Sequence, residues 1–186
     1  MVHRGKYLTL ATDTVRDSDG GQHSREIVIH PGAVAVVALT ADGRVLLVRQ
    51  YRHAASEVLL EIPAGTLDVQ ADGSIEETLP AAKRELCEET GYRAQTWRLL
   101  ATFFTAPGFA TELMTVYLAT DLEQDPDYDG PEPDERLEQV DVAFGDAIAR
   151  ARNGQIRDAK TLIGLYTVES LARAGEVAEL PGLRAR

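Results

Sequence analysis

The sequence predicts an α+β fold or a layered α/β/α arrangement, within one chain of 186 residues. Three observations predict it. Apolar runs typical of strands occupy both halves of the chain, one clear helix lies between them, and the apolar period becomes helical after Phe144. With 44% apolar and 26% charged residues, the chain can bury a core, and this composition excludes an intrinsically disordered protein.

The charge balance excludes several classes of partner. Nineteen basic residues against thirty acidic ones give a net charge of −11, which repels a nucleic-acid backbone. No run of about eighteen apolar residues is present to cross a membrane. The single cysteine, Cys87, cannot form an intrachain disulfide. We therefore expect a cytoplasmic protein that binds neither nucleic acid nor membrane.

The first third of the chain is predicted to form strands. One hairpin joins strands at 6–15 and 25–30 through the turn-forming stretch 17–21. A second hairpin joins 33–39 to 45–48, and the nearly continuous apolar run of its first strand indicates a core position. A further strand at 58–62 ends at Pro63-Ala64-Gly65, and a loop is expected over 66–74.

The clearest helix of the sequence covers residues 78–90. Gly91 follows it as a typical C-terminal cap. A start at Ser74 would resemble a capping box, but it would place Pro80 inside the helix, where its ring removes a hydrogen bond and clashes. A start near Thr78 puts Pro80 in the first turn, and we prefer it.

Strands are predicted again at 97–104, 114–119 and 139–143. The connection 121–138 contains nine acids and one arginine together with three prolines, which indicates an exposed loop, and loops of this length are often functional. Two helices complete the chain. The first covers 146–152 and is closed by Asn153-Gly154, and the second is capped by Asp158.

A group of carboxylates lies on one face of the predicted helix 78–90. Glu85, Glu88 and Glu89 fall within about one third of its circumference. Like charges at these spacings repel each other by a few tenths of a kcal/mol per pair unless a cation neutralises them. Mg²⁺ is suited to carboxylates and substrate phosphates, and Arg84 can hold a carboxylate in place. The alternative is that these residues form an ordinary solvated face.

The residues around this helix favour a metal site over an ordinary solvated face. Glu76, followed after seven residues by the run 84–92, resembles the Nudix box, whose general form is G-x5-E-x7-R-E-U-x-E-E-x-G-U, with U a bulky or aliphatic residue. One position departs from the pattern. Gln70 stands where glycine is expected, and the available Gly65 is separated from Glu76 by ten residues instead of five. We interpret residues 69–73 as a loop insertion.

Flanking segments resemble the ADP-ribose pyrophosphatase branch of the Nudix hydrolases. They are His30-Pro31-Gly32-Ala33-Val34, Val48-Arg49-Gln50-Tyr51-Arg52, Glu61-Ile62-Pro63-Ala64-Gly65 and Ala106-Pro107-Gly108-Phe109. The resemblance implies a Nudix α/β/α sandwich with a mixed β-sheet over 32–186, preceded by a small antiparallel sheet. It also implies that residues 1–31 form a hairpin region that joins two copies into a homodimer.

The resemblance further implies hydrolysis of the pyrophosphate bond of ADP-ribose or a related nucleoside diphosphate sugar. ADP-ribose would yield AMP and ribose 5-phosphate. Mg²⁺, or Mn²⁺ in its place, would be bound by Glu85, Glu89 and the backbone carbonyl of Ala64, with Glu88 assisting. Arg84 would belong to the catalytic residues.

The resemblance places the general base in the loop after the box, where we select Glu135 over its rivals Glu132, Asp134 and Glu138. Arg52 matches an arginine that contacts substrate phosphate. Glu61 either approaches the metals and substrate or makes a buried structural hydrogen bond. Arg25 would reach the nucleotide across the dimer.

Two other functions stay open at this stage. One is hydrolysis of a different nucleotide, such as a dinucleoside polyphosphate or flavin adenine dinucleotide. The other is a non-catalytic sensor of ADP-ribose. The presence of all three carboxylates and Arg84, and the absence of an appended helix-turn-helix motif in the sequence, favour the enzyme over the sensor.

Overall fold

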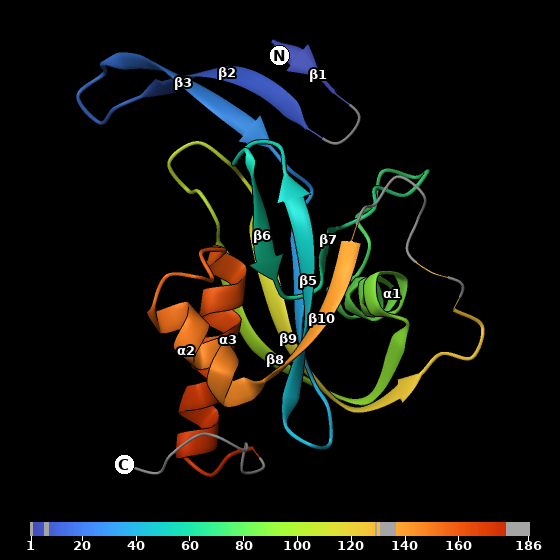
Figure 1. The fold of residues 1–186 in the computed structure, drawn as a ribbon. Coiled ribbons are helices and arrows are strands. Elements are labelled where there is room, and N and C mark those ends of the chain that lie inside the picture. The colour runs from blue at the N-terminus through green and yellow to red at the C-terminus, as the bar shows by residue number, and fades with distance from the viewer. Residues whose placement is uncertain (1, 6–7, 129, 131–136, 178–186) are drawn as a thin grey trace.

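The computed structural model describes residues 2–5, 8–128, 130 and 137–177. Within them a small sheet is formed by β1 (His3–Arg4), β2 (Thr9–Arg16) and β3 (Gln22–Ile29). A larger sheet contains β4 (Ala33–Leu39), β5 (Arg44–Arg52), β6 (Glu57–Glu61), β7 (Ala64–Thr66), β8 (Tyr92–Phe104), β9 (Leu113–Gln124) and β10 (Leu137–Ala143). The helices are α1 (Thr78–Thr90), α2 (Phe144–Arg152) and α3 (Ala159–Arg173). Figure 1 shows the small sheet standing apart from the larger one.

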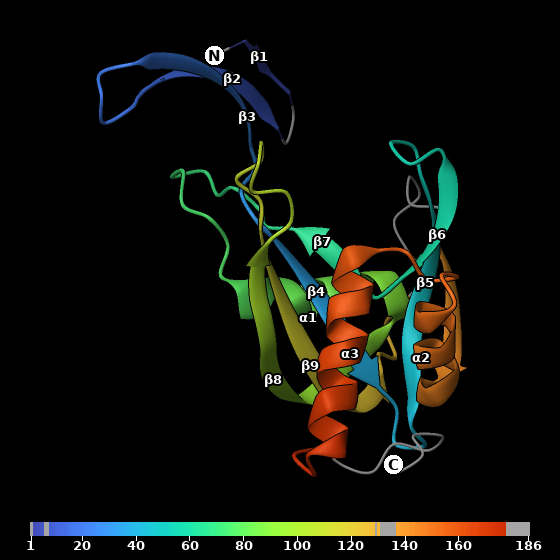
Figure 2. The same ribbon diagram turned by 90° about the vertical axis from the view of Figure 1, so that its left-hand side faces the viewer.

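The larger sheet is mixed. Its strand order is β10-β5-β4-β9-β8, with β6 added beside β5 and β7 beside β4. Strands β4 and β9 are parallel, and the other pairs are antiparallel. Helix α1 covers one face, and α2 and α3 cover the other (Figure 2). The predicted fold, a mixed sheet between helices preceded by a small antiparallel sheet, is confirmed.

Strand β4 explains the long apolar run in the sequence. Each of its seven residues is buried, because helices lie on both faces of the sheet. Alternate side chains enter two different cores. Ala33, Ala35, Val37 and Leu39 belong to the core beneath α2 and α3, and Val34, Val36 and Ala38 to the core beneath α1. The central strand is therefore fixed from both sides.

The helix boundaries follow the local signals in the sequence. Helix α1 begins at Thr78 with Pro80 in its first turn, and Gly91 follows it with a φ of 69°, in the left-handed region. Asp158 caps α3, because its side chain accepts a hydrogen bond from the Thr161 N–H at 3.0 Å. Helix α2 begins at Phe144, two residues before the predicted start.

Strands β8 and β9 are longer than predicted, which corrects part of the acidic connection. Residues 92–96 and 120–124 pair with each other, and Tyr92, Ala94 and Leu122 pack against the core beneath α1. Residues 121–124 therefore belong to a strand and not to an exposed loop. Asp125, the next residue, is buried and accepts hydrogen bonds from Cys87 and Arg93.

The small sheet is joined to the larger one through a loop. The Val28 N–H donates to the Phe109 carbonyl at 2.7 Å, and the Thr111 N–H donates to the Val28 carbonyl at 3.0 Å. Several apolar side chains in this sheet and directly beside its strands are exposed, namely Val2, Leu8, Leu10, Val15 and Ile29.

Across the described ranges, no helix is both long and apolar enough to span a bilayer.

Candidate active site

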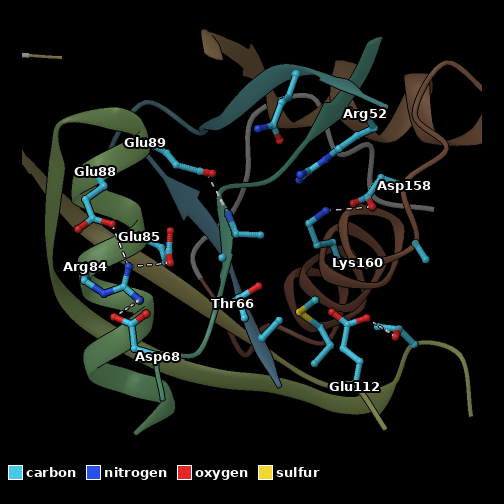
Figure 3. A pocket seen from close by; sticks show the side chains of 17 residues that line it. Arg52, Thr66, Asp68, Arg84, Glu85, Glu88, Glu89, Glu112, Asp158 and Lys160 are labelled. Atoms are coloured by element: carbon cyan, nitrogen blue, oxygen red, sulfur yellow. Dashed lines mark hydrogen bonds and ion pairs between the residues drawn. The ribbon is translucent and has the colours of Figure 1, made fainter. Parts of the chain in front are cut away.

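A cavity of about 740 Å³ lies between α1, the central strands and the first turn of α3. Figure 3 shows the carboxylates of α1 on one wall and cationic side chains on the wall opposite. Seventeen residues line it: Ala33, Gln50, Arg52, Ala64, Gly65, Thr66, Asp68, Arg84, Glu85, Glu88, Glu89, Thr105, Glu112, Met114, Asp158, Ala159 and Lys160. The residues of the α1 wall and those of the opposite wall come from segments far apart in the sequence.

The α1 wall is organised by Arg84. Its guanidinium donates to Glu85 at 2.8 Å, to Glu88 at 2.9 Å and to Glu76 at 2.9 Å. The hydrogen bond to Glu76 is the main cause that raises the pKa of Arg84, so this residue stays charged. The same bond lowers the pKa of Glu76. One cation therefore partly offsets the repulsion among the carboxylates of this face.

The predicted insertion places Glu76 next to Arg84. Residues 69–75 fold back on themselves through a bridge between Val69 and Ile75 and a hydrogen bond from the Gln70 N–H to the Ser74 carbonyl at 2.8 Å. The Glu76 N–H then donates to the Asp68 carbonyl at 2.9 Å. The chain enters and leaves the insertion at nearly the same place. Glu76 can therefore bind Arg84 despite the extra residues.

Strand β7 packs directly against the carboxylates of the α1 wall. The Ala64 N–H donates to the Glu89 carboxylate at 3.0 Å. At Gly65, a Cβ atom would lie 1.9 Å from the carboxylate of Glu85, so the close approach requires glycine. Glu85 and Glu89 are both largely buried, at 9% and 5% exposure. The strand and the helix together fix the two carboxylates.

The donor set of this wall fits a hard divalent cation. The carboxylates of Glu85 and Glu89 line the cavity and offer oxygen atoms, which Mg²⁺ prefers. In the part of the chain that the structure describes, no three acidic, histidine or cysteine side chains are grouped as a metal site. Glu85 and Glu88 turn toward Arg84 instead. Binding a metal would require these carboxylates to rotate toward the cavity.

The opposite wall is built on the buried carboxylate of Glu61. Arg52 of β5 donates two hydrogen bonds of 2.8 Å to it, and Lys160 of α3 forms an ion pair with it. Burial alone would raise the pKa of Glu61, but the bonds from Arg52 and the charge of Lys160 outweigh burial and lower it. Glu61 is 1% exposed and does not line the cavity, whereas both cations do.

A third part of the cavity is formed by Glu112 and Thr105. Glu112 accepts a hydrogen bond from the Thr105 hydroxyl, and its carboxylate lies 3.7 Å from Nε2 of His30. The backbone N–H of His30 in turn donates to the Thr111 hydroxyl at 2.9 Å. This part therefore belongs to the same loop that ties β3 to the larger sheet.

The structure brings most of the predicted site residues together. Those that line the cavity are Arg52, Ala64, Arg84, Glu85, Glu88 and Glu89, and Glu61 lies directly behind Arg52. Arg25 lies on β3, is exposed and does not line the cavity of its own chain. Glu135, Glu132 and Asp134 fall outside the described residues. Their rival Glu138 lies on β10 and pairs with Arg49 at 3.1 Å.

Sequence reasoning missed several residues of the cavity, above all Lys160. It lies 99 residues after Glu61 in the chain, and no spacing signal connects the two. Gln50 was missed as well: β5 extends beyond the predicted end at Val48, and this extension brings Gln50 to the cavity beside the predicted Arg52. For Lys160, the one local signal in the sequence was the predicted cap at Asp158, since it fixes where α3 begins and so places Lys160 in the first turn.

Comparisons with known proteins identify the domain family of this chain. A NUDIX domain model matches residues 29–162. An ADP-ribose pyrophosphatase of Bacillus subtilis is 38% identical over 169 residues, which cover 91% of this chain and 89% of the relative. A methanol dehydrogenase activator of Bacillus methanolicus is 35% identical over the same length and with the same coverage.

A solved structure supports the fold. The crystal structure of an ADP compounds hydrolase superposes with a TM-score of 0.74 at 24% identity, over 95% of this chain and 92% of that one. At this identity the likeness concerns the fold alone. The match of the domain model and the close relatives lead to one conclusion: the chain belongs to the Nudix family and is a hydrolase similar to ADP-ribose pyrophosphatase.

Proposed function

We propose that the protein hydrolyses the pyrophosphate bond of nucleoside diphosphate sugars with the help of Mg²⁺, and that ADP-ribose, cleaved to AMP and ribose 5-phosphate, is its substrate. The observation that supports this is the pairing of two opposed walls in one cavity. Arg52 and Lys160 face the carboxylates of Glu85, Glu88 and Glu89 across it. Such a cavity accepts a diphosphate between a cationic wall and a metal-binding wall.

The charge of the cavity supports the need for a metal. Six carboxylates and three cationic side chains line it, so six minus three leaves an excess of three negative charges. A diphosphate would be repelled by this excess. Bound Mg²⁺, or Mn²⁺, would neutralise the diphosphate and make a water molecule more acidic. Glu85, Glu89 and the backbone carbonyl of Ala64 would hold it, with Glu88 assisting.

The side chains of this protein would divide the remaining tasks among them. Arg52 would bind a phosphate oxygen through its guanidinium, whose charge is secured because the bond to Glu61 raises its pKa. Arg84 would keep the carboxylates of α1 in place. A carboxylate from the loop before β10 would accept the proton of the attacking water, and Glu135 is our candidate.

A substrate panel tests the proposed function. Purified protein is incubated with Mg²⁺ and ADP-ribose, other nucleotide sugars, a dinucleoside polyphosphate or flavin adenine dinucleotide, and the released nucleoside monophosphate is measured. We expect the highest kcat/KM for ADP-ribose. A preference for a dinucleotide would contradict the substrate assignment. Tight binding of ADP-ribose with no product would identify a sensor instead.

Glu89→Gln tests the metal-binding wall. The amide oxygen of glutamine can still accept the hydrogen bond from the Ala64 N–H, so the fold should persist. Because a charged ligand is lost, turnover should fall at least about 10–100-fold, the loss typical even for residues that only support a ligand. The exposed Glu77, whose side chain makes no cap hydrogen bond, supplies the control Glu77→Gln. Equal activity of both variants in saturating Mg²⁺ would contradict the metal site.

We further propose that two copies associate through the small N-terminal sheet, and that the protein works in the cytoplasm. The exposed apolar side chains of β2 and β3 support the association, since contact with a second copy would remove their apolar surface from water. Arg25, on β3, would then face the cavity of the partner. Light scattering should give a mass of about twice 20.3 kDa. A monomeric mass at micromolar concentration would contradict the dimer.

A further inference from the structure

The side chain of Lys160 is held in an unusual position for a lysine. It is only 11% exposed, yet it lines the cavity from the first turn of α3. Two carboxylates hold it there, Glu61 through an ion pair and Asp158 through a hydrogen bond of 3.0 Å. Lysine usually keeps its ammonium group in water, so its confinement here requires an explanation.

Ion pairs within the protein do not use all the hydrogen-bond donors of the Lys160 ammonium group. The group carries three N–H donors, and the described residues accept two of them, at Glu61 and Asp158. The third donor is left for the cavity that Lys160 lines. Arg52 already satisfies Glu61 with two hydrogen bonds of 2.8 Å, so this carboxylate has its own charge-assisted partner without Lys160.

The first turn of α3 is anchored so that Lys160 cannot swing away. Thr161 is fully buried, and its hydroxyl accepts a hydrogen bond from the Ile62 N–H at 2.9 Å while donating to Asp158 at 2.6 Å. Ile62 directly follows Glu61. The end of β6 and the start of α3 are therefore joined at two adjacent residues: the Glu61 carboxylate binds Lys160, and the Ile62 N–H binds Thr161.

We propose that Lys160 is a second substrate-binding cation, which donates to a phosphate oxygen of the diphosphate beside Arg52, and that Glu61 is the positioning residue for both cations. Arg52 and Lys160 share the carboxylate of Glu61, so their spacing at the cavity wall is fixed before the substrate arrives. This inference rests on the proposed function, because it takes the ligand to be a diphosphate.

Binding measurements on Lys160→Gln test the inference. The probe is α,β-methylene-ADP, which cannot be hydrolysed between its phosphates, titrated calorimetrically in the presence of Mg²⁺ and compared with adenosine. Loss of one charge-assisted hydrogen bond should weaken binding of the diphosphate probe about 10–100-fold and leave adenosine unaffected. Lys83→Gln, an exposed lysine outside the cavity, is the matched control and should bind both as the parent does. Unchanged affinity of Lys160→Gln for the probe would overturn the inference.

A second measurement avoids any effect of the substitution on folding. Acetic anhydride acetylates lysines of the unaltered protein, and mass spectrometry reports the extent at each site. The diphosphate probe should protect Lys160 and adenosine should not, while Lys83 serves as the internal reference. Equal acetylation of Lys160 with and without the probe would overturn the inference.

The two proposals fail in different ways. The proposed hydrolysis would be overturned if the unaltered protein bound the probe but released no nucleoside monophosphate from any substrate. Protection of Lys160 by the probe would in that case still support the role of Lys160 in binding. Hydrolysis of ADP-ribose with an unchanged KM and kcat in Lys160→Gln would overturn the role of Lys160 and support the hydrolysis. For Glu61, the positioning role predicts that Glu61→Gln raises KM by at least the factor seen for Lys160→Gln.

Discussion

At the level of single residues, Gly65 sets the geometry of the metal-binding wall. Its neighbour Ala64 binds Glu89, and its own position lies directly under the carboxylate of Glu85. A side chain at this point would occupy the space of that carboxylate. Glycine is therefore needed here for close approach and not for an unusual backbone angle, since its φ is not in the left-handed region.

Gly65→Ala should lower turnover about 100-fold while leaving the protein folded. The added Cβ lies 1.9 Å from the Glu85 carboxylate, which must move by more than an ångström. A displacement of this size in a catalytic site costs about 100-fold in kcat. Gly108→Ala is the matched control, because a Cβ there meets nothing within 4 Å. Circular dichroism and steady-state kinetics check both variants. Normal activity of Gly65→Ala would mean that Glu85 is not needed where it stands.

The candidate site could be predicted from the sequence only in part. The spacing of Glu85, Glu88 and Glu89 on one helix is a local signal, because helical geometry alone places them on one face. Glu61 and Lys160 illustrate the opposite case. Their ion pair joins the end of β6 to the start of α3 across 99 residues, and only the folded sheet brings them together.

At the level of the elements, α3 packs closely against the central strand at Gly164. Gly164, in the middle of the helix, is buried and faces β4. A Cβ atom there would lie 2.7 Å from Cγ2 of Val37 and 3.3 Å from Cδ1 of Ile62. Val37 is fully buried, and its β-branched side chain has little freedom to move. The glycine therefore lets the helix that contains Lys160 dock against the sheet.

Gly164→Ala should destabilise the protein, which is the opposite of what helix propensity predicts. Alanine favours a helix by up to about 1 kcal/mol over glycine. Overpacking of a core costs about 1–3 kcal/mol and should outweigh this gain. Urea unfolding should show a lower midpoint for Gly164→Ala, whereas Ser170→Ala at an exposed position of the same helix should stay within about 0.5 kcal/mol of the parent. A stabilised Gly164→Ala would show that the interface has room.

Element boundaries were predictable where the signal is local. Helix α1 begins and ends as expected because Pro80 and Gly91 act on their own neighbours. The extra length of β8 and β9 was not predictable, since it depends on pairing between residues 92–96 and 120–124. Acidic residues in the second segment looked like loop residues, but Leu122 between them faces the core.

At the level of the whole molecule, a protein with a net charge of −11 places several of its carboxylates against arginine or lysine. Glu169 is an example between elements: it lies on α3 and binds Arg152 at the end of α2 and Arg173 on its own helix, each at 2.6 Å. Burial would raise the pKa of Glu169, but the bonds from Arg173 and Arg152 lower it. The pKa of Asp141 is lowered by Arg44, and that of Glu61 by Arg52 and Lys160.

These lowered pKa values predict that acid unfolds the protein. Each such carboxyl binds fewer protons in the folded state than in the unfolded state, so its stabilising effect is present above the unfolded pKa of about 4 and is lost as the pH falls through the folded pKa. The free energy of unfolding, measured with urea, should therefore contain a nearly constant contribution from these groups between pH 7 and about pH 5. This contribution should be lost progressively below about pH 4. Glu169→Gln removes one of the titrating groups, so its stability should be lower at pH 7 and should fall less on acidification. If Glu169→Gln lost as much stability as the parent between pH 5 and pH 3, the link between α2 and α3 through this carboxylate would not contribute to acid unfolding.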